Sequence, residues 1–160
     1  KADVAVADGR IDAVAPQIDG EAARPIDAAD LHLAPGFIDA HTHSDLPLLA
    51  DPKAQSKIRQ GVTTEVIGNC GSSPAPLSGR AVEEARASVS LLELELTWQS
   101  FGEYLDRLRG TAVNVVPQVG HNTVRGSVMG YDDAKPTPEQ QQQMELHIVL
   151  EYMMLQQMQL

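Results

Sequence analysis

The fold of this chain is decided at residues 61–71, which have the sequence Gly-Val-Thr-Thr-Glu-Val-Ile-Gly-Asn-Cys-Gly. The β-branched run at 62–67 predicts a strand, and the Gly-Asn-Cys-Gly that follows predicts a glycine-rich loop. Upstream, the apolar residues 37–40 predict another short strand. Residues 53–60 predict a helix between the two strands, and Gly61 ends it because glycine is favoured after a helix C-terminus.

The same alternation continues downstream of the loop. Within a longer helical region, Ser100 and Glu103 match the Ser-x-x-Glu capping box that starts a helix. Residues 113–119 predict a third strand, interrupted by Pro117, which lacks the N–H that a sheet requires. A last helix is expected to start at Pro138, since proline is favoured in the first helical turn. Three strands that alternate with helices indicate an α/β fold with a parallel sheet.

The first 36 residues have a different character. Alternating apolar residues on either side of Asp8-Gly9 predict a β-hairpin, because this dipeptide supplies the positive φ that a tight turn needs. Leu31 and Leu33 alternate in the same way and predict a further short strand. We therefore divide the chain into a small antiparallel sheet at 1–36 and an α/β part at 37–160.

Composition and charge limit the classes of function. The 160 residues carry 12 basic and 22 acidic side chains, so the formal net charge is 12 − 22 = −10. A field of this sign excludes a nucleic-acid binder that works by attracting phosphates. No apolar stretch approaches the roughly 20 residues that span a bilayer, so we expect a soluble protein without a membrane partner. The first residue is Lys1, so we expect the natural N-terminus to be missing.

Candidate metal ligands follow the first two strands of the α/β part. His41 and His43 come directly after the strand at 37–40, and Cys70 lies in the loop after the next strand. Parallel strands carry their functional sites at their carboxyl ends, so the three side chains are expected at one edge of the sheet. Imidazole and thiolate donors together select zinc or a similar ion. The alternatives are two polar residues closing a strand and a buried cysteine, but the flanking glycines argue against burial.

Other polar residues lie near the predicted edge. His121 and Arg125 follow the third strand and are candidates for substrate binding, Arg125 because guanidinium can hold a carboxylate with two hydrogen bonds. An ordinary surface arginine is an equally good interpretation. Asp39 and Asp45 flank the histidine pair, where they either orient the imidazoles or cap local backbone.

Two other classes of His-x-His protein fit less well. Residues 41–45 begin like the His-x-His-x-Asp-His motif of metallo-β-lactamase-fold hydrolases, but Leu46 stands where the last histidine is required. Cupins also use His-x-His, yet they are all-β proteins, and the predicted helices contradict that fold.

Longer motifs resemble one known family. Pro-Gly-Phe-Ile-Asp-Ala-His-Thr-His at 35–43 is similar to the first-strand signature of the amidohydrolase superfamily. Within it, the chain resembles the N-acyl-D-amino-acid deacylases, and the residues that carry this likeness are 61–64, 68–71, 75–77, 101–109, 119–121, 123–125 and 129–130. The resemblance extends from residue 1 to about residue 139.

The resemblance implies a fold and a reaction. It implies a (β/α)8 barrel, of which this chain supplies about three βα units, beside a small β-sandwich built partly from residues 1–36. It also implies zinc held by His41, His43 and Cys70, and hydrolysis of the acyl amide of small N-acyl-D-amino acids. The general-base aspartate and two further histidine ligands are expected beyond the chain end. The 160 residues alone are therefore expected to show little or no deacylase activity.

Some features depart from the family pattern. Glu65 occupies a strand position where relatives would carry an apolar residue, and His147 lies in mid-helix, so we do not expect it to be a ligand. The segment 140–160 has apolar residues on more than one face, which predicts either a barrel helix buried on several sides by neighbours that come later in the chain, or self-association. Two rival functions remain: an amidohydrolase of cyclic amides, of the dihydroorotase or hydantoinase kind, and a non-catalytic scaffold. The single cysteine fits a reducing compartment, so we expect the protein in the cytoplasm.

Overall fold

Residues 1–157, with side chains to residue 154, are described by a computed structural model that divides into two units, 1–34 and the chain from residue 35 onward. In the first unit, β1 (Asp3–Ala7) pairs antiparallel with β2 (Arg10–Ala15). Asp8 and Gly9 between them have φ values of 49° and 73°, as the turn requires. The predicted hairpin is confirmed.

The further strand predicted around Leu31 and Leu33 is wrong. Residues 16–36 contain no strand, and these two side chains are 72% and 74% exposed. Alternation of apolar residues favours a strand only where one face is covered and a neighbouring strand supplies hydrogen bonds. Residues 16–36 therefore form a connection of bends and turns instead.

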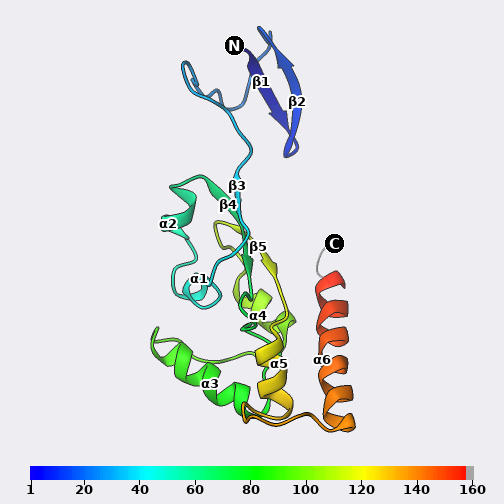
Figure 1. The fold of residues 1–160 in the computed structure, drawn as a ribbon. Coiled ribbons are helices and arrows are strands. Elements are labelled where there is room, and N and C mark those ends of the chain that lie inside the picture. Colours follow the sequence, from blue (N-terminus) through cyan, green and yellow to red (C-terminus); the bar gives the residue numbers. More distant parts are fainter. Residues whose placement is uncertain (158–160) are drawn as a thin grey trace. The chain divides into compact units, whose positions relative to one another are not determined.

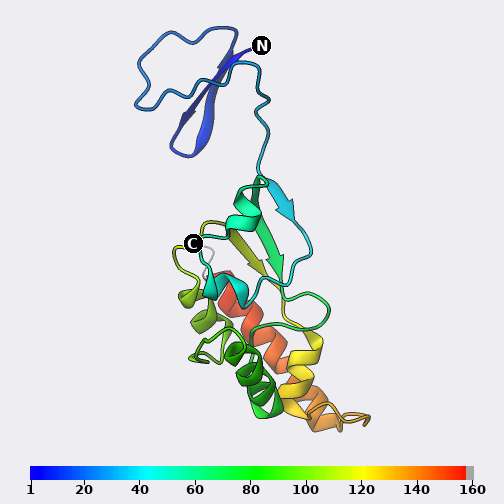
Figure 2. The same cartoon turned by 90° about the vertical axis from the view of Figure 1, so that its left-hand side faces the viewer.

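Three parallel strands form the sheet of the second unit (Figure 1). They are β3 (Phe37–Asp39), β4 (Val62–Ile67) and β5 (Asn114–Pro117), in the order β3-β4-β5. Figure 2 shows all three strands pointing the same way. The predicted α/β class and the parallel sheet are confirmed. β5 is shorter than the predicted 113–119 and ends at Pro117. The N–H of Gln118 still donates a 3.0 Å hydrogen bond to the Ile67 carbonyl oxygen of β4.

Helices connect the strands in the predicted order. Two short helices lie between β3 and β4, two longer ones between β4 and β5, and two after β5: α1 (Pro47–Ala50), α2 (Gln55–Ile58), α3 (Gly79–Ser90), α4 (Phe101–Arg107), α5 (His121–Val128) and α6 (Pro138–Gln157). The helix predicted at 53–60 is shorter because Ala54 has a left-handed backbone, with φ 45°, and cannot belong to it. Helix α1 was not predicted.

The core of the second unit lies between the sheet and helices α1, α3 and α4. Phe101 and Tyr104 of α4 are fully buried, and their rings meet edge to face at 6.3 Å. Ser100 and Glu103 form the predicted capping box, which fixes where α4 begins. The other large apolar residues buried in this core are Leu48, Ile67, Leu77, Val89, Trp98, Leu108 and Val113.

Helix α6 packs against α4 and α5 (Figures 1 and 2). Met144 and Glu151 are buried, and Glu151 Oε2 accepts a hydrogen bond of 3.0 Å from the backbone N–H of Phe101. Apolar side chains around the rest of the helix are exposed in this structure, namely Leu146, Ile148, Val149, Leu150, Tyr152 and Met153. The burial predicted for this helix depends on neighbours later in the chain, so it stays a prediction. The end of the predicted segment, 158–160, lies outside the described residues. Among residues 1–157, none of the helices has the length and apolarity needed to cross a membrane.

Candidate metal centre

Two loops at the carboxyl ends of β3 and β4 bring three donor side chains together. The ligand atoms of His41, His43 and Cys70 all lie within 4.8 Å of one another, and all three residues are exposed. Cys70 Sγ is 3.3 Å from His41 Nε2, and the two imidazole rings lie 5.5 Å apart at 66°. The geometry therefore brings together the three residues that the sequence singled out.

The histidine pair lies just beyond β3, not within it, because the strand ends at Asp39. The alternation of a strand nevertheless continues: Thr42 and Ser44 are buried, whereas His41 and His43 are exposed. The two imidazoles therefore lie on the same face, as side chains two apart do in a strand.

The loop that carries Cys70 has an unusual backbone. Cys70 has φ 55°, a left-handed conformation that a non-glycine residue adopts rarely. Gly68 has φ 79°, and a Cβ there would lie 2.1 Å from the Gln118 carbonyl oxygen. On the other side, the Gly71 carbonyl accepts a 2.8 Å hydrogen bond from the N–H of Asn122 in α5. The loop is therefore held close to the residues that follow β5. The backbone conformation of Cys70 then sets the direction of its thiol.

Asn69 joins the two loops, and sequence reasoning gave it no role. Its Nδ2 donates to the carbonyl oxygens of Thr42 at 3.1 Å and Val66 at 2.7 Å. The Thr42 N–H in turn donates to the Val66 carbonyl at 3.2 Å. The signal in the sequence was its place beside Cys70, because an asparagine in a loop at a strand end is suited to bonding backbone groups.

The two aspartates that flank the histidines bind backbone amides. Asp39 Oδ1 accepts from the N–H of His41 at 3.2 Å, and Asp45 Oδ1 accepts from the N–H of Gly68 at 2.8 Å. The hydrogen bond from Lys57, and secondarily that from His41, lowers the pKa of Asp39. Burial raises the pKa of Asp45, while the bond from Gly68 acts in the opposite direction.

Tyr104 of α4 holds the same loop, and sequence reasoning assigned it no role at the site. Its hydroxyl donates a 2.6 Å hydrogen bond to the Asp45 carbonyl oxygen. Burial, with the nearby Asp45 and Glu65 charges, raises the pKa of the phenol. Tyr104 therefore stays a neutral donor, and it ties the loop after β3 to the core.

The two predicted substrate-binding residues lie on α5. His121 is its first residue and is exposed, but it does not belong to the three-donor cluster found among the described residues. Arg125 Nη2 donates to the carbonyl oxygens of Asp132 at 2.7 Å and Ala134 at 2.8 Å. One guanidinium nitrogen thus holds the following loop.

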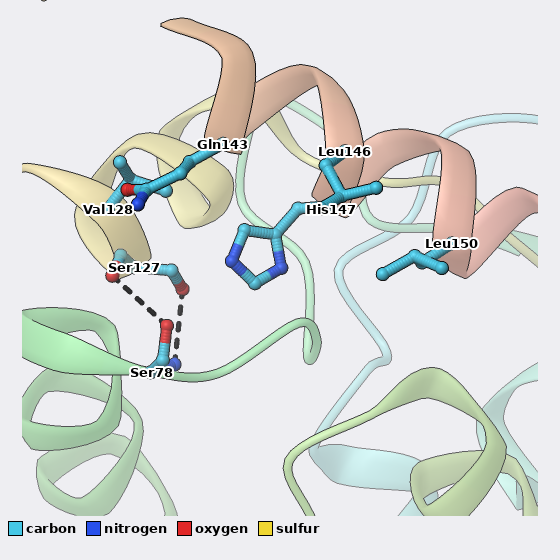
Figure 3. Close-up of a pocket in the computed structure, with 7 residues that line it drawn as sticks. All are labelled: Ser78, Ser127, Val128, Gln143, Leu146, His147 and Leu150. Carbon is cyan, nitrogen blue, oxygen red and sulfur yellow. Dashed lines mark hydrogen bonds between the residues drawn. The ribbon is translucent and has the colours of Figure 1, made fainter. Parts of the chain in front are cut away.

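A separate cavity of about 330 Å³ lies between α5, α6 and the start of α3 (Figure 3). His147 points into it from α6, opposite Ser78 and Ser127. The seryl hydroxyls already bond backbone: Ser78 Oγ donates to the Ser127 carbonyl and Ser127 Oγ to the Pro76 carbonyl. The three donors line no part of this cavity, so we place the candidate site at the donor cluster.

Comparison with known proteins identifies the family. The chain matches the profile of the amidohydrolase family over residues 24–153. The chain belongs to this family. The match confirms the resemblance to the amidohydrolase superfamily. The matched residues include all three donors, His41, His43 and Cys70.

Curated proteins that are similar to this chain include deacylases. The chain is 46% identical to N-acyl-D-aspartate deacylase and 44% identical to D-aminoacylase, both of Alcaligenes xylosoxydans xylosoxydans. These alignments cover 79% and 81% of this chain but only 26% and 27% of the relatives. They support the deacylase branch that the motifs indicated.

Solved structures give the same result. A D-aminoacylase studied for its binuclear metal centre superposes with a TM-score of 0.82 at 39% identity, over 96% of this chain and 32% of that one. N-acyl-D-glutamate deacylase of Bordetella bronchiseptica, solved with zinc and a phosphonate inhibitor, superposes with a TM-score of 0.70 at 38% identity, over 92% and 31%. The chain therefore spans about a quarter to a third of the length of these relatives.

Proposed function

We propose that His41, His43 and Cys70 bind zinc in an enzyme that hydrolyses the acyl amide of N-acyl-D-amino acids. The observation that carries this proposal is the convergence of the three ligand atoms to within 4.8 Å of one another. Two imidazoles and one thiolate form a donor set that suits zinc better than magnesium or calcium. The deacylase relatives support the choice of reaction.

The residues of the centre fit a metal ion in chemistry as well as in spacing. All three are accessible, and the loops that carry them are fixed by backbone hydrogen bonds. When bound, zinc would lower the pKa of a water molecule and polarise the acyl carbonyl. We keep His121 and Arg125 as proposed substrate-binding residues, because α5 begins at the same edge of the sheet. The general base is expected from an aspartate outside this chain.

We also propose the larger architecture in which this centre acts. The three βα units would be the first units of a (β/α)8 barrel, with residues 1–36 contributing to a β-sandwich and 37–160 to the barrel. The parallel order of β3, β4 and β5 and the donors at their carboxyl ends support this proposal. Full turnover would then need groups from the other units, so low activity is expected of this chain alone.

A cyclic-amide hydrolase is the weaker alternative. Many such relatives bridge their metals with a carboxylated lysine, and here Cys70 provides the donor after β4. The thiol therefore supports a linear amide as substrate. The lone cysteine also supports a reducing compartment, and on that ground we propose the cytoplasm.

Zinc analysis of purified chains tests the centre. The unchanged chain is expected to retain zinc after dialysis, whereas Cys70→Ser and His41→Ala should lose most of it. His147→Ala is the matched control, because this histidine lies outside the donor cluster and its removal should leave the zinc content unchanged. Equal zinc in all four proteins would refute the ligand assignment.

The exposed apolar side chains of α6 support a second proposal, self-association of two copies through the segment 140–160. Leu146 and Leu150 are about half exposed, so replacing both with glutamate should leave the fold intact. Sedimentation of the two proteins would then separate a dimer from a monomer. A monomeric unchanged chain would exclude this role and the scaffold function with it.

A further inference from the structure

A lysine from α2 reaches the loop that carries the histidine pair. Lys57 Nζ donates a 2.5 Å hydrogen bond to Asp39 Oδ2 and a 3.0 Å hydrogen bond to Thr42 Oγ1. Its helix is only four residues long and starts after the left-handed Ala54, and Asp39 is the last residue of β3. One ammonium group therefore contacts both sides of His41.

One of the two acceptors bonds the backbone of His41 directly, and the other is the side chain of the residue between the two histidines. Asp39 uses its other oxygen, Oδ1, to accept the His41 N–H. Thr42 lies between His41 and His43, and its Oγ1 also lies 2.7 Å from Ser44 Oγ. The chain of bonds from Lys57 thus fixes the residues before, between and after the two imidazoles.

The burial of this ion pair sets it apart from an ordinary surface pair. The side chains of Lys57 and Asp39 are 24% and 28% exposed, whereas those of the Lys1–Asp30 pair are 92% and 86% exposed. Exposed pairs hold geometry poorly because water and salt screen them. A shielded pair with a third partner, Thr42, restricts the lysine to one position.

We propose that Lys57 is a positioning residue that holds His41 and His43 at the separation needed to bind one metal ion. The inference rests on the proposed metal centre and adds to it the group that sets the spacing of two ligands. Lys57 itself does not belong to the donor cluster. Partners that orient metal ligands typically change metal affinity by about 10–100-fold when they are removed.

Cobalt binding by the full 160-residue chain tests the role. Cobalt(II) replaces zinc as the probe, because its visible bands report ligand geometry and a thiolate adds a charge-transfer band. Lys57→Met is expected to weaken cobalt affinity by about 10–100-fold and to shift the visible bands at saturation. Lys57→Arg should restore much of the affinity. Lys53→Met, a change of an exposed lysine four residues earlier, is the matched control and should behave as the unchanged chain.

A second variant keeps the test decisive if Lys57→Met does not fold. Thr42→Val retains the Lys57–Asp39 pair and removes only the hydroxyl, so it should lower cobalt affinity several-fold. Unchanged affinity and spectrum in either variant would overturn the inference, even if thermal stability falls, because the lysine would then be structural only. Failure of the unchanged chain to bind cobalt would instead overturn the proposed metal centre, and the inference with it.

Discussion

Glu65 is expected to destabilise the protein. It points into the core from β4, is fully buried, and neither of its carboxylate oxygens has a hydrogen-bond partner among the described residues. An unsatisfied buried polar group costs about 1–3 kcal/mol in mutational studies. Methionine has a similar length and no oxygen, so Glu65→Met should raise the free energy of unfolding by about 1–3 kcal/mol. For a chain of this size, each kcal/mol raises Tm by about 2–4 °C.

The single tryptophan gives a direct assay of this gain. Trp98 is buried in the same core, 5.6 Å from the Tyr104 ring, so its fluorescence in urea follows unfolding of the second unit. Glu65→Gln should gain less than Glu65→Met, because it removes the charge but keeps two polar atoms. Glu95→Met on the exposed surface should change stability by less than about 0.5 kcal/mol. A Glu65→Met protein less stable than the unchanged chain would refute the reasoning.

Three further changes have defined outcomes. Gly68→Ala should destabilise by at least about 2 kcal/mol in urea, because its Cβ would meet Gln118, whereas Gly110→Ala, also at positive φ but in open space, should cost only about 1 kcal/mol. Ser100→Ala removes the side-chain cap of α4 and should lower stability by about 1 kcal/mol in the same assay. Burial raises the pKa of Glu151 above its ordinary value of 4.5. Its stabilising contribution is therefore complete below that pH and is lost as pH rises through the folded pKa. The Tm of Glu151→Gln should therefore rise further above the Tm of the unchanged chain as pH rises from 4 to 7.

The order of the α/β elements could be predicted because each has a strong local signal. The β-branched run of β4, the capping box of α4 and the proline that opens α6 all depend on neighbouring residues only. The failures occurred where tertiary surroundings decide. Leu31 and Leu33 form no strand because they have no neighbouring strand, and α2 is shortened by the left-handed backbone of Ala54.

The donors of the candidate site could also be predicted, since strand ends and residue types are visible in the sequence. The bonds that hold the donors could not be predicted in this way. Asn69 and Tyr104 reach loops that are 27 and 59 positions away in the chain, and such partners carry no local pattern. The sequence left two roles open for Asp39 and Asp45, and the hydrogen bonds observed are to backbone amides.

The two loops of the site are fixed by different means, and this predicts different responses to mutation. The Cys70 loop depends on backbone conformation: positive φ angles and contact with the end of β5 leave no room for a Cβ at Gly68. A side chain added at Gly68 should therefore lower the stability of the fold before it alters metal binding. The histidine loop depends on the side chains of Lys57 in α2 and Asn69 in the loop after β4, which can be shortened without a steric clash. Changes at Lys57 should therefore alter metal affinity in a chain that remains folded. Mutations in one loop thus change mainly the free energy of unfolding, and mutations in the other change mainly the metal affinity.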